Sequence, residues 1–249
     1  MKDRAGGSPV DLERLLPEGT RRRRLFQRAL AGGERPIVVA SMSRAGSTTL
    51  FWGVAKSWTK LRFGPLAPGL IPCLADAAWR LDETPLIGGV VYKTHDLPEN
   101  LSRAARPRVL FTYRKASDVA LSLAHCRTDL GDAWFRSARQ RLRGRGQYEQ
   151  FLRADTLGLE KQVDLWSKAE GVDVLGLRYE TLWDHTQDIE DFLGFPVRLR
   201  GRKASRRPKP SGDLVDLLRE TYAKLDRKIE KMPDVFVRRS APGQSVRPD

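Results

Sequence analysis

The chain has 249 residues, and its 45 Lys and Arg against 31 Asp and Glu give it a formal charge of +14 with His neutral. With 40% hydrophobic residues it can bury a sizeable core, which argues against disorder over most of its length. The apolar runs are far shorter than the ~20 residues of a membrane helix, so we expect no transmembrane segment. No secretory signal is visible and the two cysteines form no disulfide framework, so we expect a cytoplasmic location.

The sequence divides into an extension, one folded domain and a tail. Residues 1–35 mix Gly, Pro and Arg with a few spaced leucines, and we expect a loosely held helical and basic extension. Residues 36–238 are expected to form a single α/β domain, because one domain commonly reaches this length. Residues 239–249 are expected to be a disordered tail.

Four apolar runs in the domain alternate with helical patterns. The runs are PIVVAS (36–41), GGVVYKT (88–94), RVLFTYR (108–114) and VDVLGLRY (172–179). Helical periodicity is found at 50–58, 115–126, 159–169 and 214–225. Apolar strands without polar alternation are typical of a parallel sheet covered on both faces. We therefore predict an α/β fold, a three-layer sandwich around a central, mainly parallel sheet.

The first strand leads through the loop SRAGSTT into a helix, an arrangement whose backbone N–H groups and helix dipole can hold a phosphate. Gly46 would let the backbone approach the ligand, and Arg44 would add a positive charge. Ser47 and Thr48 would add hydroxyl donors. No lysine precedes Ser47, so the Walker pattern of magnesium nucleotide-triphosphate sites is absent. Taken alone, the loop also fits a plain turn between a strand and a helix.

The motif YKTHDLP places Lys93 and His95 at the end of a buried strand, two residues apart and on the same side while the strand continues. A cation and a proton acceptor that face a phosphate crevice suit group-transfer chemistry. A single histidine is more often structural than catalytic, yet this placement favours a catalytic pair.

The motif YRKASDVALS places Arg114 at the end of a strand and Ser122 about two turns into the next helix. Arg114 would bind a second phosphate as a bidentate donor, and Ser122 would reach the same group if the helix leans over the crevice. Taken alone, the motif also fits a surface arginine and an ordinary helical serine.

In this order and spacing, the three motifs resemble those of the sulfotransferases that use 3'-phosphoadenosine 5'-phosphosulfate (PAPS). SRAGSTT looks like the 5'-phosphosulfate loop of that family, YRKASDVALS like its 3'-phosphate motif, and YKTHDLP like its catalytic strand. LRYETL, residues 177–182, is similar to a fourth family segment whose tyrosine lies against the adenine. The resemblance covers about residues 36–215 and implies a fold related to the P-loop kinases. The arginine of the loop is nearer to the bacterial and carbohydrate branches than to the cytosolic small-molecule branch.

The resemblance implies catalytic roles for His95 as general base and for Lys93 and Arg44 as cations at the reacting group, without a metal. The donor-binding residues that it implies are Arg44, Ala45, Gly46, Ser47, Thr48, Thr49, Arg114, Ser122, Tyr179, Arg206 and Arg207. Ala45 and Thr49 depart from the cytosolic branch, which has serine and tryptophan there. Tyr179 fits a core tyrosine nearly as well, and the basic segment 198–210, with Arg206 and Arg207, fits either a loop that closes over the donor or a solvated one.

These roles imply transfer of a sulfuryl group from PAPS to a hydroxyl, or an amine, of an unidentified acceptor. The acceptor would be a small molecule or a glycan, and the arginines between 136 and 145 would suit an acidic one. Residues 59–88 and 126–158 would form its pocket, with four candidate aromatic walls, Phe63, Trp79, Trp134 and Phe135.

Two alternative functions are left open by the sequence. A P-loop-like phosphotransferase would need ATP and magnesium, and the missing Walker lysine argues against it. A non-enzymatic polyanion or nucleic-acid binder would explain the charge of +14. No helix-turn-helix, zinc or RNA-binding signature is visible, so we expect no specific nucleic-acid partner.

Overall fold

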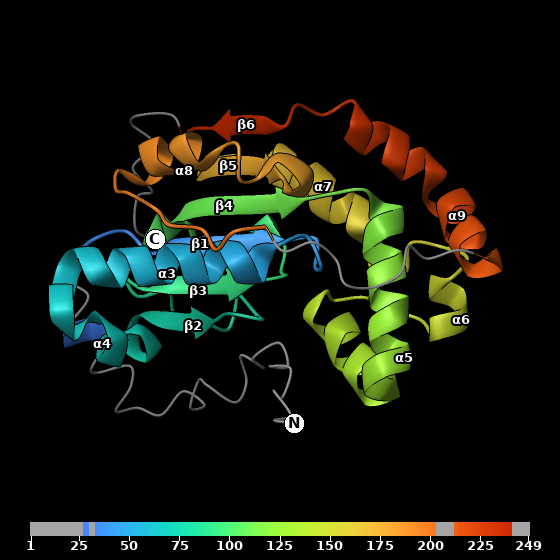
Figure 1. The fold of residues 1–249 in the computed structure, drawn as a ribbon, viewed down its shortest axis with the longest axis horizontal. Helices are drawn as coiled ribbons and strands as arrows, with labels where there is room; N and C mark the ends of the chain where they lie inside the picture. Colours follow the sequence, from blue (N-terminus) through green and yellow to red (C-terminus); the bar gives the residue numbers. More distant parts are fainter. Residues whose placement is uncertain (1–26, 30–32, 203–211, 241–249) are drawn as a thin grey trace, which may run out of the picture.

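The computed structural model describes residues 27–29, 33–202 and 212–240, which form a six-stranded sheet flanked by helices (Figure 1). The strands are β1 (Ile37–Ser41), β2 (Ala75–Ala77), β3 (Val91–Thr94), β4 (Arg108–Tyr113), β5 (Asp173–Arg178) and β6 (Val235–Arg238). The helices are α3 (Ser47–Phe63), α4 (Ala67–Leu74), α5 (Ala116–Arg141), α6 (Tyr148–Phe151), α7 (Leu159–Ser167), α8 (Thr186–Leu193) and α9 (Asp213–Glu230).

The strand order is β2-β3-β1-β4-β5-β6, with β1 at the centre between β3 and β4. All pairings are parallel except that of β5 with β6, which are antiparallel at the edge of the sheet. Ala40 is level with Thr94 on one side and with Phe111 on the other, so the three central strands end together. In Figure 1 the arrows of β2, β3 and β4 point to the right and that of β6 to the left. Residues that follow the parallel strands therefore gather at one edge.

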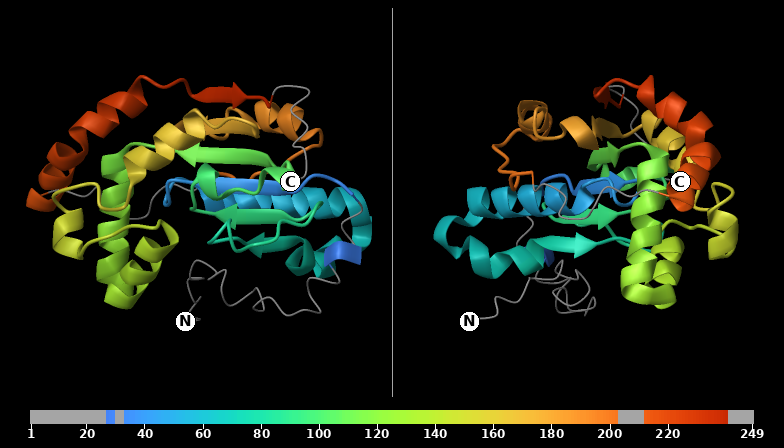
Figure 2. Two further views of the ribbon diagram at one scale, coloured as in Figure 1. Left: turned by 180° about the vertical axis from the view of Figure 1, so that it is seen from behind. Right: turned by 45° about the vertical axis from the view of Figure 1, so that its right-hand side comes forward.

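Alternate residues of β1 face opposite sides of the sheet. Val38 and Ala40 belong to a core that includes residues of α5, α7 and α9. Ile37 and Val39 belong to a second core, formed with α3 and α8. Helices thus cover both faces, and the views of Figure 2 show them on either side of the sheet. The predicted α/β class, a three-layer sandwich around a mainly parallel sheet, is confirmed.

The four predicted strands are all present, but the structure adds β2, β6 and a longer α5. The helical pattern predicted to end at residue 126 continues to Arg141, with a break at Gly131, where φ is 83° and ψ is 174°. This backbone conformation is open to glycine and strained for other residues, so the helix changes direction there. The second half of α5 carries Arg141 towards the carboxyl edge of the sheet, as the contacts below show.

Both ends of the described domain are tied to Asp173, at the start of β5. Nη1 of Arg35 donates to one carboxylate oxygen at 2.7 Å, and the backbone N–H of Ser240 donates to the other at 2.9 Å. The folded domain therefore includes residues 35 and 240. Most of the predicted extension 1–35, most of the predicted tail 239–249, and Arg206 and Arg207 lie outside the described residues.

Three further findings concern the described part of the chain alone. None of its helices combines the length and the apolarity that crossing a membrane requires. It holds no group of three or more His, Cys, Asp or Glu side chains arranged to bind a metal ion. Cys73 is half-buried and Cys126 is buried, each as a free thiol.

Candidate functional site

The candidate site lies at the carboxyl ends of β3, β1 and β4. The helix after β1, α3, covers one face of the sheet, whereas the helix after β4, α5, covers the other. In a parallel α/β sheet this reversal opens a crevice between the two strands, where ligands commonly bind. Nη1 of Arg114, just beyond β4, lies 3.5 Å from the carbonyl oxygen of Arg44 in the loop after β1. The two motifs predicted to bind phosphate therefore meet at this point of the sheet.

The loop of residues 42–46 has a backbone suited to binding an anion. Ser43, Arg44 and Gly46 have positive φ angles of 64°, 50° and 79°. Left-handed residues within a short turn direct their N–H groups towards a common point, which forms an anion-binding concavity. Helix α3 begins directly afterwards, at Ser47, without a side-chain cap and without an acidic residue in its first turn. The positive end of the helix dipole thus adds to the attraction of the loop for an anion.

Gly46 also permits a close contact with Tyr179. A Cβ atom at position 46 would lie 2.4 Å from Cδ2 of Tyr179, so the ring packs directly on the loop. The guanidinium of Arg114 lies over that ring, 4.9 Å from its centroid, and Trp183 meets it edge-on at 5.7 Å. Tyr179 is half-exposed. The predicted adenine contact is therefore a partly accessible ring fixed beside the loop 42–46.

Arg114 and Ser122 both lie against this loop. The hydroxyl of Ser122 accepts a hydrogen bond from Nε of Arg44 at 2.9 Å. The guanidinium of Arg114 is ion-paired with Asp118 at 2.8 Å and with Glu180 at 3.4 Å. A phosphate bound by Arg114 would share the guanidinium with these carboxylates or displace them. The two side chains predicted to hold a second phosphate are thus at one place, with charged neighbours that the sequence analysis did not foresee.

Lys93 and His95 lie on the other side of β1, at the end of β3. Nζ of Lys93 donates to the hydroxyl of Thr48 at 2.8 Å, so a lysine from the neighbouring strand reaches the first turn of α3. Nδ1 of His95 lies 3.1 Å from the carbonyl oxygen and 3.0 Å from the hydroxyl of Ser41. Because a carbonyl can only accept, Nδ1 carries the proton, and Nε2 is the nitrogen able to take one.

Both side chains are buried among cations. Burial, followed by the charges of Arg141 and Arg44, lowers the pKa of Lys93 to about 7. Burial, followed by the charge of Lys93, lowers the pKa of His95 to about 3, although its bond to the Ser41 carbonyl acts in the opposite direction. At neutral pH the imidazole is therefore neutral. An anion bound among these cations would raise both pKa values, because it favours the charged forms.

The turn that carries His95 is fixed by the neighbouring Asp96, whose carboxylate is buried. It accepts two hydrogen bonds from Arg143, at 2.6 and 2.9 Å, and one from the backbone N–H of Leu81 at 2.8 Å. Burial raises the pKa of Asp96, but the bonds from Arg143 and from backbone N–H groups outweigh it and lower the pKa overall. This carboxylate thus joins three segments, namely the end of β3, the residues around 81 and the end of α5.

Helix α7 holds the same turn from a further side. The side-chain amide of Gln162 donates to the carbonyl oxygen of His95 at 2.5 Å, and the indole N–H of Trp166 donates to that of Asp96 at 3.1 Å. Both donors are buried. The backbone that carries the imidazole is therefore held in position by α7 and by the contacts of Asp96.

Two residues outside the three motifs complete the site. The indole of Trp79 stacks on the imidazole of His95, with ring centroids 5.3 Å apart and an angle of 26° between the planes. The guanidinium of Arg141 lies over the indole at 4.7 Å from its centroid, and Nζ of Lys93 lies 5.9 Å from it. Sequence reasoning included Trp79 among four aromatics and Arg141 only within a group of arginines. By contrast, Phe135 is buried in the core, where it packs against other rings.

The structure places the other predicted site residues as follows. The side chain of Ala45 is fully buried, so only its backbone can face a ligand. Ser47 is also buried, whereas Thr49 is half-exposed in the first turn of α3. Arg206 and Arg207 lie outside the described residues, but Arg202, from the same basic segment, donates to the carbonyl oxygen of Glu180 at 3.2 Å.

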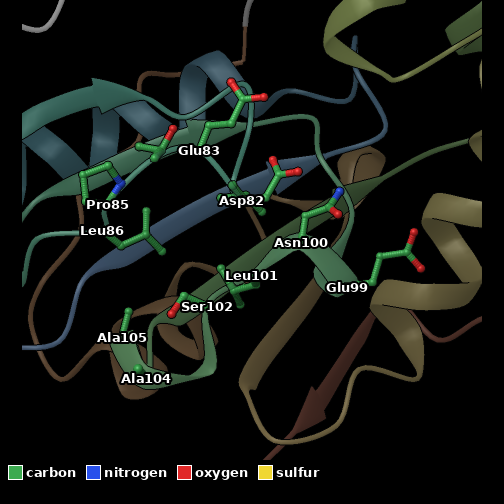
Figure 3. A pocket seen from close by; sticks show the side chains of 12 residues that line it. Asp82, Glu83, Pro85, Leu86, Glu99, Asn100, Leu101, Ser102, Ala104 and Ala105 are labelled. Carbon is green, nitrogen blue, oxygen red and sulfur yellow. The ribbon is translucent and has the colours of Figure 1, made fainter.

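A separate open hollow of about 800 Å³ lies beside this site, lined by residues 81–86, 99–102, 104 and 105. Figure 3 shows the carboxylates of Asp82, Glu83 and Glu99 on its upper and right side, and Ala104 and Ala105 at its lower left. Asp82 is paired with Arg143 and Glu99 with Lys161. None of the predicted catalytic or donor-binding residues lines the hollow, although residues 81–86 belong to a segment predicted to form the acceptor pocket. Its acidic rim does not suit a phosphate. The candidate site is therefore the motif cluster rather than the hollow.

No protein-family model and no curated protein matches the sequence. Among solved structures, a mouse sulfotransferase, SULT7A1, complexed with PAP matches 72% of this chain at 16% sequence identity, with a TM-score of 0.38. The match spans 65% of that chain, which is less than two thirds of its length. At this level of likeness, the function of the present protein has to be argued from the chemistry of its own site.

Proposed function

We propose that this protein transfers a sulfuryl group from PAPS to a hydroxyl, or an amine, of an acceptor. The observation that supports this most directly is the convergence of three motifs from distant parts of the sequence. The contact of Arg44 with Ser122 and that of Lys93 with Thr48 both involve the motif SRAGSTT, in the loop after β1 and the first turn of α3. His95 is hydrogen-bonded to the carbonyl oxygen of Ser41, the last residue of β1. Side chains suited to a ligand with two phosphates and an imidazole suited to accept a proton therefore lie at the same edge of the sheet.

The donor would be bound by the residues that line the crevice on both sides of β1. The 5'-phosphosulfate would lie on the N–H groups of loop 42–46, between Arg44 and Lys93. The 3'-phosphate would lie at Arg114 and Ser122, and the adenine against Tyr179. Each group of the nucleotide then faces a side chain of matching chemistry, with charge-assisted bonds to its anionic oxygens.

The transfer step needs only a base and fixed cations. Nε2 of His95 takes the proton of the acceptor hydroxyl as its oxygen forms a bond to sulfur. The bond between sulfur and the phosphate oxygen breaks, and its electron pair stays on that oxygen, whose charge Lys93 and Arg44 stabilise. The products are the sulfated acceptor and 3'-phosphoadenosine 5'-phosphate (PAP). Positioning and charge neutralisation carry such a reaction, as they do in phosphoryl transfer.

The test of the donor site is calorimetric titration with PAP beside ATP with magnesium, at two salt concentrations. We expect one-to-one, micromolar binding of PAP that requires the 3'-phosphate. Preference for ATP with magnesium would favour a phosphotransferase. Binding of any polyanion with a steep salt dependence would favour a polyanion binder. Either result would contradict the sulfotransferase proposal.

The test of the base is the substitution His95→Ala. We expect loss of acceptor turnover with nearly unchanged PAP affinity, because the imidazole acts on the acceptor proton and not on the donor phosphates. His185→Ala is the matched control, since His185 precedes α8 and pairs with Asp188 on that helix. Near-normal turnover by the His95 variant would show that another group is the base.

A further inference from the structure

Helices α3 and α4 are joined by an apolar segment that lies at the surface rather than in the core. Residues 63–71, FGPLAPGLI, carry no polar or charged side chain, and only Ala67 among them is buried. Leu66 is 72% exposed, and Leu61, in the last turn of α3, is 59% exposed. We call Leu61 and residues 63–71 the apolar tip. A run of apolar side chains outside the core marks an interaction surface.

The sequence around the apolar tip is basic. The interval between Glu34 and Asp76 contains no acidic residue and five Lys or Arg. Lys56 and Lys60 are exposed on α3, one turn apart and directly before the tip. Glu34 pairs with Arg62 at 3.2 Å, so its charge is compensated locally. A negatively charged partner would therefore meet lysines beside the apolar side chains.

A second basic group is attached to the chain close to the apolar tip. The side-chain amide of Gln27 donates to the carboxylate of Asp76 at 3.3 Å, which ties residue 27 to the strand that follows α4. Figures 1 and 2 show residues 27–29, in blue, beside α4. Residues 21–24 are four arginines, which lie outside the described residues. Arg24 precedes Gln27 by three residues, so the chain keeps it within about 11 Å of that residue.

We propose that the apolar tip, together with the basic residues near it, docks on the surface of an anionic lipid bilayer. Exposed apolar side chains insert between the headgroups and the acyl chains, and cations beside them are attracted to anionic headgroups. A second copy of this chain is a poorer partner, because a symmetric contact between two tips would bring the lysines of both copies together.

Docking through the apolar tip leaves the candidate site accessible. Helix α3 begins beside the loop 42–46, at the carboxyl edge of the sheet, and its 17 residues span about 25 Å. In Figure 1, α4 lies at the left end of α3, whereas the arrows of β2, β3 and β4 point to the right. The tip and the site are therefore at opposite edges of the sheet, and vesicle binding and PAP binding should be independent.

The experiment is co-sedimentation of the full chain with two kinds of vesicle. One is phosphatidylcholine alone, and the other is equal parts of phosphatidylcholine and phosphatidylserine. The apolar variant carries Leu61→Gln and Leu66→Gln, and the basic variant carries Lys56→Gln and Lys60→Gln. Leu130→Gln is the matched control, because Leu130 is 55% exposed but belongs to α5. Denaturant unfolding shows whether each variant is folded.

We expect the unchanged protein to bind the vesicles with phosphatidylserine at least roughly tenfold more tightly than those without it. The apolar variant should lose roughly tenfold or more of this affinity, because two leucines no longer leave water on docking. The basic variant should lose several-fold, and so should a variant with glutamine at positions 21–24. Leu130→Gln should bind as the unchanged protein does.

Three results of the vesicle experiment would overturn the proposal. They are binding to neither kind of vesicle, equal binding to both kinds, and undiminished binding by the apolar variant. Sedimentation equilibrium without vesicles supplies a fourth. A dimer that the apolar variant dissociates would identify the tip as a contact between two copies. None of these results bears on the donor site, which PAP titration of the same proteins tests separately.

Discussion

Lys93 is a buried cation whose environment favours the neutral amine, and this makes donor binding sensitive to pH. With its pKa lowered to about 7, Lys93 is mostly neutral at about pH 8 in the free protein. A bound polyanion raises that pKa, so PAP binding at this pH should take up roughly one proton. Calorimetry in two buffers of different ionisation enthalpy measures the uptake. Lys93→Met should abolish it, and an equal uptake in that variant would assign the proton to another group.

The same substitution has a predicted effect on stability, with a defined sign. The folded-state pKa of Lys93 lies below its ordinary value of 10.5, so between pH 7 and 10.5 the unfolded chain binds the extra proton. The cost of burying the charge is then complete below pH 7 and vanishes above 10.5. Lys93→Met should therefore raise the free energy of unfolding most at or below neutral pH. Equal gains at neutral and strongly alkaline pH would show that packing, and not charge, is responsible.

Arg114 should discriminate nucleotides by their 3'-phosphate. Arg114→Ala is expected to weaken PAP binding by about 1.5 to 3 kcal/mol, the range for a hydrogen bond to a charged group. The variant should bind PAP and adenosine 5'-phosphate with similar affinity. Arg219→Ala, which removes a mostly exposed arginine on α9, is the control. Retained discrimination in the Arg114 variant would place the 3'-phosphate elsewhere.

The sequence could predict the motif residues of the candidate site but not the placement of Trp79 and Arg141 beside them. Four predicted residues lie at the end of an apolar run or within three residues after it, namely Arg44, Lys93, His95 and Arg114. Strand topology alone therefore brings them to one edge of the sheet. Arg141 lies far along a helix from its strand, and its position depends on a break at Gly131 that local periodicity does not reveal. The stack of Trp79 on His95 is likewise a tertiary contact without a local signal.

Among the structural elements, the segments around Asp96 act as one unit. Asp96 accepts hydrogen bonds from Arg143, just after α5, and from Leu81, near Trp79, and so connects the segments that carry Arg141 and Trp79 to the turn of His95. Asp96→Ala should lower the free energy of unfolding by about 3 kcal/mol or more, because it leaves a guanidinium and buried N–H groups without their partner. Denaturant unfolding measures the loss.

Asp82→Asn is the matched control for this prediction, because Asp82 pairs with the same arginine from an exposed position. Its loss should cost less than about 1 kcal/mol, as is usual for surface ion pairs. Comparable losses in the two variants would mean that burial of Asp96 adds nothing to the contact.

An acid titration of stability checks the sign of the pH dependence. Since the pKa of Asp96 is lowered, its contribution should be present above the ordinary carboxyl pKa and be lost as the pH falls.

The two strands that the sequence patterns did not predict, β2 and β6, both lack a run of buried apolar residues. Strand β2 has three residues, ADA, and is too short and too polar to form an apolar run. Strand β6 is an antiparallel edge strand whose residues are half-buried or exposed, unlike the fully buried β1. Both faces of the predicted strands are covered, which favours apolar residues at most positions and so produces the runs that the sequence shows.

For the whole molecule, the charge of +14 should act on encounter rather than on affinity at the site. Screening by salt weakens long-range attraction and affects short contacts in a partly buried crevice much less. Raising the ionic strength from roughly 0.05 to 0.5 M should therefore lower the association rate of PAP several-fold and leave its dissociation rate nearly unchanged. Stopped-flow tryptophan fluorescence is a suitable measurement, because Trp79 and Trp183 lie at the site.

The effect of net charge can be measured apart from that of the site with a variant in which glutamine replaces Arg21, Arg22, Arg23 and Arg24. This variant reduces the net charge from +14 to 14 − 4 = +10 and alters none of the motif residues. Its association rate should depend less on salt, and its dissociation rate should match that of the unchanged protein. Displacement of PAP by duplex DNA, with affinity falling steeply in salt, would instead indicate that the basic residues of the chain bind polyanions. Polyanion binding by the basic residues would then be the function, and the convergence of the three motifs would need another explanation.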